Sequence, residues 1–177
     1  MSDELKEQGL ALFRRGEYDQ ALTVFQEAAG SYEVAGEPAG RGEMLNNCGV
    51  IYRYLRQWDK GIAILDEAKA LFTELGDQQR LGQTLGNLAM LQAGQGQADL
   101  AMSSYGASAA AFAADGDGAK QSEMLRALSL LQLRKGLWLP AILTMQESAA
   151  VHPHPSVGQH FIRLLFGWAN RLLGGRQ

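Results

Sequence analysis

Few side chains in this sequence could support catalysis or hold a metal ion. The three histidines, His152, His154 and His160, fall in one proline-punctuated stretch, "HPHPSVGQH". A metal site would need further ligands, and no Asp, Glu or Cys follows Glu147. We therefore interpret the stretch as a rigid connector and expect no metal site.

The remaining candidates for chemistry are one cysteine and the many glycines. Cys48 lies next to Gly49 on an apolar helical face, so we expect a buried structural thiol and not a nucleophile. The stretch "GQTLGNLAMLQAGQG" lacks the Lys-Ser/Thr pair of a phosphate-binding loop and follows no predicted strand. No Ser/His/Asp arrangement can be assembled. The sequence thus predicts no catalytic residue, no cofactor and no enzyme.

Composition narrows the class of protein further. The 177 residues are 46% hydrophobic and 20% charged, which is typical of a globular chain. A net charge of −3 argues against a general nucleic-acid binder, which needs a basic face. The acidic start "MSDELKEQG" is unlike a secretory signal, and no apolar run reaches the roughly 18 residues of a spanning helix. We expect a cytoplasmic protein.

A 40-residue repeat organises the chain. We call the residues at one position of successive copies a column. One column is Leu in all four copies, another is always tiny, and the column that contains Gly36 is followed each time by an acid. Self-similarity at a fixed period is the signature of a repeat architecture. The first two columns are Leu5, Leu45, Leu85 and Leu125, and Ala21, Gly61, Ala101 and Ala141.

Each copy contains two amphipathic helical patterns joined by a short polar turn, which predicts a helix hairpin. We place the hairpins at about 1–37, 38–77, 78–117 and 118–153. Tiny residues are expected to face one another inside a hairpin, Gly49 against Gly61 and Ala89 against Ala101. A large residue, Trp58 or Trp138, is expected to fill the space near the turn. Gly76 is expected to end one helix and Asp77 to cap the next.

These columns resemble the tetratricopeptide repeat family. Its pattern of Gly–x–aromatic at the turn, then Ala–x3–aromatic–x2–Ala, is matched by Gly16, Tyr18, Ala21, Phe25 and Ala28. The resemblance covers roughly residues 2–153, with a period of 40 in place of the usual 34 residues, as in a long-repeat subclass. It implies an all-α, right-handed solenoid with a concave wall lined by the first helix of each hairpin.

The exposed face of these first helices is the candidate binding surface. Asn47 and Asn87 share the column where the family uses an amide to hold a peptide backbone, because an amide both donates and accepts. Apolar and basic residues lie beside them, and a solvated face should not carry so many apolar groups. The predicted site consists of Asn47, Val50, Arg53, Tyr54, Asn87, Met90, Arg126, Leu130 and Arg134. Part of this face could instead pack against the protein's own C-terminal segment.

Residues 154–177 form a separate, Pro-bounded segment with a predicted amphipathic helix. It contains three arginines and no acid, and its apolar residues cover more than half of the helix. Three interpretations remain open at this stage: a capping helix that also forms a homodimer, a simple cap partly folded into the groove, or a helix at a membrane interface. The residues concerned are Phe161, Leu165, Phe166, Trp168 and Leu172.

The sequence as a whole predicts a non-enzymatic scaffold for protein–protein interaction. Its partner would be a peptide or helix with an apolar stripe and acidic groups, bound on the concave wall. The alternative is a membrane-associated assembly or targeting factor, anchored by the basic, apolar C-terminal helix.

Overall fold

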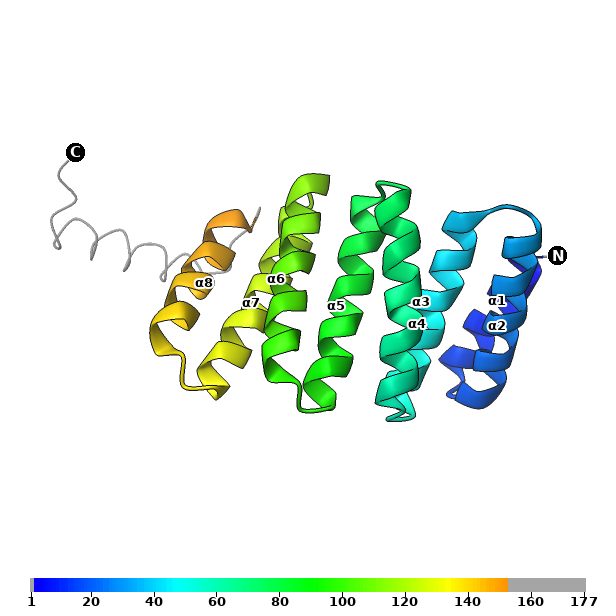
Figure 1. The fold of residues 1–177 in the computed structure, drawn as a ribbon, viewed down its shortest axis with the longest axis horizontal. Helices are drawn as coiled ribbons and strands as arrows, with labels where there is room; N and C mark the ends of the chain where they lie inside the picture. The colour runs from blue at the N-terminus through cyan, green and yellow to red at the C-terminus, as the bar shows by residue number, and fades with distance from the viewer. Residues whose placement is uncertain (1, 153–177) are drawn as a thin grey trace, which may run out of the picture.

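The structure is a computed structural model that describes residues 2–152, and these form eight α-helices without a strand. The helices lie side by side in chain order, so that α1 and α8 are at opposite ends of an elongated array (Figure 1). Their bounds are α1 Ser2–Arg14, α2 Tyr18–Val34, α3 Pro38–Tyr54, α4 Trp58–Glu74, α5 Gln78–Gly94, α6 Ala98–Asp115, α7 Gly118–Arg134 and α8 Trp138–Val151.

The helices pair into four antiparallel hairpins, α1–α2, α3–α4, α5–α6 and α7–α8. Every helix packs on the next one along the chain, and α3 also contacts α5 directly. The first helices of the hairpins therefore form one layer and the second helices another. The predicted all-α solenoid of four helix hairpins is confirmed, whereas the predicted final helix lies outside the described residues.

A left-handed glycine follows the second helix at each of the three boundaries between hairpins, and an aspartate caps the next helix at two of them. Gly76 has φ 67°, a left-handed conformation that ends α4 without the strain a side chain would add. Asp77 follows it and accepts a hydrogen bond from the Arg80 N–H at 2.9 Å, which caps α5. Asp117 caps α7 in the same way through the Lys120 N–H at 3.0 Å.

The hairpins close by inserting large side chains over glycines. A Cβ atom added to Gly42 would lie 2.7 Å from the buried ring of Phe72, and one added to Gly49 would lie 2.4 Å from Leu65. Gly49 and Gly61 do not face one another as predicted, because Gly49 leaves room for Leu65 of the opposite helix. Gly61 receives Leu91 of the next hairpin at 2.8 Å.

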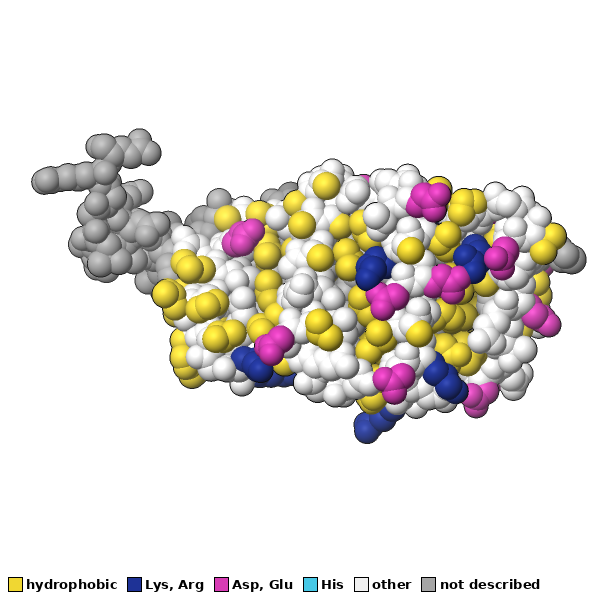
Figure 2. Space-filling view, in the orientation of Figure 1, with side chains coloured by type: hydrophobic (Ala, Val, Ile, Leu, Met, Phe, Trp, Pro, Cys, Tyr) yellow, Lys and Arg dark blue, Asp and Glu magenta, His cyan; other side chains and the backbone are white. Residues whose placement is uncertain are grey.

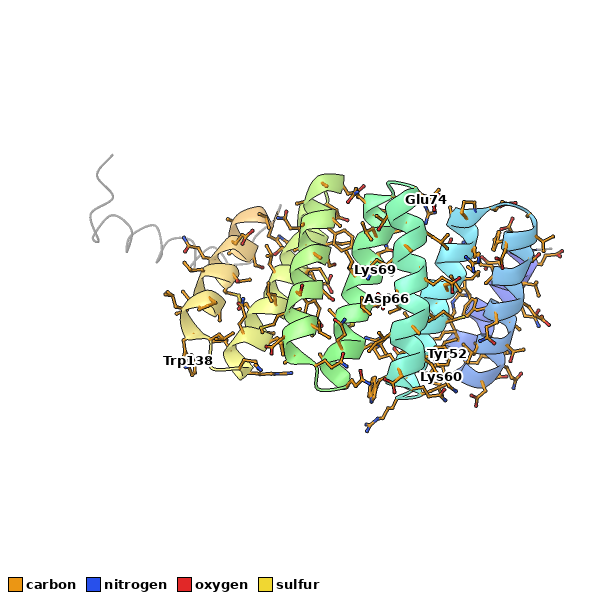
Figure 3. All side chains as sticks on the ribbon, viewed as in Figure 1. Tyr52, Lys60, Asp66, Lys69, Glu74 and Trp138 are labelled. Atoms are coloured by element: carbon orange, nitrogen blue, oxygen red, sulfur yellow. The ribbon has the colours of Figure 1, made fainter. Side chains whose placement is uncertain are left out.

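The tryptophans also differ from the prediction. Trp58 packs over Gly94 of the following hairpin, where an added Cβ would lie 2.8 Å from the indole, so it joins two hairpins and does not fill its own turn. Trp138, at the start of α8, is 68% exposed. Figure 3 shows it at the outer edge of the array. Its predicted role inside the fourth hairpin is therefore wrong.

Candidate functional site

The surface of interest is the inner wall, which we define as the face of α1, α3, α5 and α7 that bears the column Leu10, Val50, Met90 and Leu130. Ion pairing joins its first two helices, because Lys6 Nζ lies 2.7 Å from Glu43 Oε1. In the described part of the chain, four hollows lie on or beside this wall. Seven of the nine predicted site residues line these hollows, whereas Arg53 and Tyr54 do not.

The central hollow has a volume of about 230 Å³ and lies between α3, α5 and α7. Asn87 Nδ2 donates a hydrogen bond to Asn46 Oδ1 at 3.1 Å across the gap from α5 to α3. Met90 and Gly86 form part of its floor. Each amide keeps unused hydrogen-bonding capacity, since an amide can donate twice and accept twice. The pair can therefore hold a peptide group in a fixed orientation.

Asn47 lies in a different place from Asn87. It lines a hollow of about 70 Å³ between α1 and α3, together with Val50 and two apolar residues of α1, Leu10 and Phe13. The two asparagines of the predicted column thus belong to separate hollows. An extended ligand would have to run across several hairpins to contact both.

A third hollow, of about 190 Å³, combines apolar and basic groups. Leu130 and Arg134 of α7 line it, and the ring of Tyr105 in α6 lies beneath them. Burial raises the pKa of the Tyr105 phenol, and the nearby positive charges of Arg53 and Arg134 oppose that rise. Arg134 lines this hollow, whereas Arg53 is not among its lining residues and lies beside Tyr54 and Met90.

Tyr54 and Arg53 extend this region toward the first hairpin. The Tyr54 ring stacks on Tyr18 with centroids 5.0 Å apart and meets Phe13 edge-on at 5.7 Å. Tyr54 nevertheless stays 51% exposed. The Arg53 guanidinium lies 5.2 Å from the centre of the Tyr54 ring, and its Nη1 approaches Met90 Sδ of α5 at 2.6 Å. An aromatic platform beside a guanidinium suits a ligand with apolar and acidic groups.

Arg126 lies apart from the other predicted arginines. It borders a hollow of about 320 Å³ near the start of α7, next to Lys120 and Glu123. Within residues 2–152, none of the wall arginines forms an ion pair, although most other cationic side chains of this range do. The wall arginines are Arg14, Arg53, Arg126 and Arg134.

Two residues of this surface are not part of the predicted site. Asn46 precedes Asn47 by one position, and the column analysis could not show that Asn87 pairs with it across two helices. Tyr105 belongs to a column with Phe25 and Leu65 that indicates core packing. It does pack in the core, but its position between the arginines of two neighbouring hairpins depends on the stacking of those hairpins.

Other chemistry is limited in the described part of the chain. Burial raises the pKa of the Cys48 thiol to about 12, so the predicted buried thiol is confirmed and the thiolate is scarce at neutral pH. Residues 2–152 contain no group of side chains that could hold a metal ion and no helix long and apolar enough to cross a membrane. The predicted C-terminal residues, from Phe161 to Leu172, lie outside the described range.

Comparisons with known proteins agree with this α-solenoid architecture. Residues 40–114 match the sequence profile of the tetratricopeptide repeat family. Residues 40–114 are therefore tetratricopeptide repeats, as their columns predict. No curated protein sequence matches it significantly.

Several solved structures have a similar fold. BtubC (BKLC) from P. vanneervenii has a TM-score of 0.76 at 19% identity, over 88% of this chain and 67% of that one. A putative kinesin light chain from Podospora anserina has a TM-score of 0.70 at 12% identity, over 84% of this chain and 74% of that one. MamA from Desulfovibrio magneticus RS-1 has a TM-score of 0.66 at 14% identity, over 85% of this chain and 75% of that one. At such low identity these similarities show the fold alone.

Proposed function

We propose that this protein is a non-enzymatic interaction scaffold that binds a segment of a partner protein along its inner wall. Tetratricopeptide repeat proteins generally bind protein partners, and their solenoid provides an extended surface for this purpose. The observation that carries the proposal is that guanidinium groups lie beside apolar groups on this wall, Arg134 with Leu130 in one hollow and Arg53 beside the Tyr54 ring. Arginines without an acidic partner beside exposed apolar groups fit a ligand with acidic and apolar side chains.

We assign separate roles to the wall residues according to the hollows that they line. The Asn46–Asn87 pair would hold the ligand's backbone, and Met90 would contact its apolar side chains in the central hollow. Leu130, which is 45% exposed, and Tyr54 would extend this apolar contact on either side. Asn47 and Val50 would contact a more distant part of the ligand, whereas Arg126 would meet it only near the start of α7. The expected cytoplasmic location remains a prediction.

A peptide selection tests the proposal without knowledge of the natural partner. We would select peptides from a displayed random library on the wild-type protein and measure their affinities by calorimetry. The selected peptides should contain an acidic residue near apolar ones. The double substitution Arg53→Ala and Arg134→Ala should weaken binding by about tenfold or more, because hydrogen bonds to charged groups contribute about 1.5–3 kcal/mol. Raising the salt concentration should reduce the difference between wild type and variant.

The matched control removes two positive charges from the opposite side of the molecule. Lys60 and Lys69 lie on α4, away from the inner wall (Figure 3). The double substitution Lys60→Ala and Lys69→Ala should change affinity by less than about twofold, since it alters net charge equally but touches no hollow. Equal losses in the two double variants would mean that only net charge matters. Unchanged affinity in the arginine variant would refute this site.

A further inference from the structure

The central hollow is open because α5 presents a glycine where its neighbours present polar side chains. Gly86 is buried and borders the hollow, and its column holds Lys6 in α1 and Asn46 in α3. Lys6 reaches the next first helix, where its Nζ lies 2.7 Å from Glu43 Oε1. Asn46 does the same, because its Oδ1 accepts a hydrogen bond from Asn87 of α5. At Gly86 there is no side chain that could cross from α5 to α7.

The acid that would receive such a side chain is nevertheless present. Glu123 of α7 stands 37 residues after Gly86, the same separation as between Lys6 and Glu43. Both Glu123 and Gly86 border the central hollow. Among residues 2–152 no cationic side chain forms an ion pair with Glu123, whereas Glu43 has Lys6. The junction of α5 and α7 therefore keeps the acid of this pair and lacks its base.

Charges on the outer face of the molecule are balanced locally. On the face where α4 lies in front of α3, basic side chains lie mostly beside acidic ones (Figure 2). Lys69 Nζ, for example, lies 2.5 Å from Asp66 Oδ1. The acid beside the central hollow contrasts with this pattern, so a base from outside the described chain would complete it.

Lys120 also borders the central hollow, but its charge is already balanced. Its Nζ lies 3.1 Å from Asp117 Oδ2 and 5.3 Å from the centre of the Phe112 ring. Arg126, three residues beyond Glu123, lines the neighbouring hollow of about 320 Å³ and not this one. With Asp117 counted, two acids and one base surround the central hollow, and this balance favours a further cation.

The rest of the lining suits the stem of a basic side chain. Met90, Phe112 and Met124 provide apolar surface, and the exposed Gln83 provides an amide oxygen. Lysine and arginine bury their methylene stems along apolar surface while the charged end stays in a polar environment. An exposed acid beside an apolar floor therefore matches a lysine or arginine better than a purely apolar side chain.

We propose that the central hollow holds a lysine or arginine side chain of the partner segment, whose cation pairs with Glu123 as Lys6 pairs with Glu43. The partner thereby supplies the base that Gly86 lacks. This inference rests on the proposed function of the inner wall. It adds a base to the acidic and apolar groups that the rest of the wall requires of the partner.

The peptide selection on the wild-type protein gives the first test. The selected peptides should carry a lysine or arginine at one position, in addition to acidic and apolar residues. A parallel selection on Glu123→Gln should lose this preference, because glutamine keeps the shape of the side chain but carries no charge. Selection on Glu74→Gln, at the end of α4 (Figure 3), should retain it, since this control removes the same charge from an exposed residue that does not line the hollow.

A thermodynamic cycle measures the pairing itself. Replacing the basic residue of the peptide by norleucine keeps an apolar stem and removes the charge. On the wild-type protein this change should weaken binding by about three- to tenfold, the range between an exposed ion pair and a hydrogen bond to a charged group. On Glu123→Gln it should weaken binding by less than about twofold, whereas on Glu74→Gln the full loss should remain.

Gly86→Lys supplies the base from α5 itself, so its effect on stability needs no ligand. The new Cβ would lie 3.0 Å from Met124 Sδ, near the flexible end of a side chain that can move. Adding Glu123→Gln to Gly86→Lys should lower the Tm by about 1–3 °C, because it removes the new ion pair. Adding it to Gly86→Met, of similar length but uncharged, should not. Gly86→Lys should also weaken the binding of the selected peptides at least as much as Glu123→Gln does, because it fills the hollow.

The outcomes separate this inference from the proposed function. Peptides that bind through Arg53 and Arg134, but show no basic preference and no loss on Glu123→Gln, overturn the inference and leave the proposed function intact. A loss on Glu123→Gln without a loss in the arginine variant supports the inference and refutes the arginine site. Peptides that respond to neither change refute both. A folded Gly86→Lys variant whose Tm is indifferent to Glu123→Gln also overturns the inference. If Gly86→Lys does not fold, the peptide measurements on Glu123→Gln decide, since that residue is exposed.

Discussion

The second and fourth hairpins occupy the same columns of the repeat but are held together differently. In α3–α4, glycines receive the buried side chains of Phe72 and Leu65, whose exposure is 1% and 0%. In α7–α8, Ser122 stands in the column of Gly42, and its Oγ donates to the Ser148 carbonyl at 2.8 Å. Ser148 Oγ returns a hydrogen bond of the same length to the Ser122 carbonyl.

This difference indicates that the stability of the array decreases toward its described C-terminal end. A buried large apolar side chain contributes about 1.5–3 kcal/mol, whereas an intramolecular hydrogen bond contributes about 1 kcal/mol net. The largest apolar core cluster accordingly belongs to α1–α4. In a solenoid each hairpin contacts only its neighbours, so a weaker hairpin can open without the rest. The following predictions test this gradient, from the largest expected effect to the smallest.

One column provides a direct comparison of the two hairpins. Leu65→Ala should lower the free energy of unfolding by about 2–5 kcal/mol, because Leu65 is fully buried over Gly49. Met145→Ala, in the same column, should cost less than about half as much, since Met145 is only half-buried. Urea denaturation measures both losses, and amide hydrogen exchange shows which hairpin opens. Equal losses in the two variants would contradict the gradient.

The glycines that receive large side chains should not tolerate a methyl group. Gly42→Ala should destabilise the protein by about 1–3 kcal/mol, because the new Cβ would overlap the buried Phe72 ring. Gly106 lies in the helical interior of α6 with nothing within 4 Å of an added Cβ. Gly106→Ala should therefore stabilise by about 0.5–1 kcal/mol through the better helix propensity of alanine. Thermal unfolding of the pair checks the contrast, and a loss in both would show that propensity is not the cause.

At the helix N-termini the fourth hairpin has the additional stabilising contact, because a capping aspartate precedes α7 and none precedes α3. Hydrogen bonds from Lys120 lower the pKa of Asp117, whereas Glu37, in the same column, makes no capping bond. A carboxyl with a lower pKa in the folded state stabilises the fold above its ordinary pKa of about 4 and loses that contribution as pH falls through the folded value. Asp117→Ala should cost about 1 kcal/mol at pH 7 and much less near pH 2.

Urea titrations at the two pH values measure this effect. Glu37→Ala is the control from the same column and should cost less than about 0.5 kcal/mol at either pH, as expected for a surface substitution. Asp117→Asn should keep most of the stability and show less pH dependence, because an amide also caps but does not titrate in this range. A cost of Asp117→Ala that is the same at pH 7 and pH 2 would exclude the carboxylate as its source.

The sequence predicts the hairpins well, because local rules and the repeat give the same answer. The Leu45 column, the left-handed Gly76 and the capping Asp77 each determine a feature within a few residues of themselves. The contacts between hairpins were harder to predict. The Asn46–Asn87 bond and the packing of Trp58 on Gly94 join residues 41 and 36 positions apart, and their partners depend on how neighbouring hairpins stack.

The same reasoning explains how the residues of the candidate site are grouped. Asn47 and Asn87 share a column, yet they line different hollows because each hollow lies between two or three successive helices. A column compares equivalent positions in different hairpins, whereas a hollow joins non-equivalent positions of adjacent hairpins. The set of wall residues could be derived from periodicity, but their grouping required the three-dimensional arrangement.

The fit of Trp58 on Gly94 has a consequence for how such a chain can evolve. Recombination between copies of a repeated gene could remove residues 78–117 and leave every column in phase. Trp58 would then meet Arg134, a long charged side chain, where it now meets bare backbone. The hairpins share one period, but the matched sizes at their junctions fix the order in which they can follow one another.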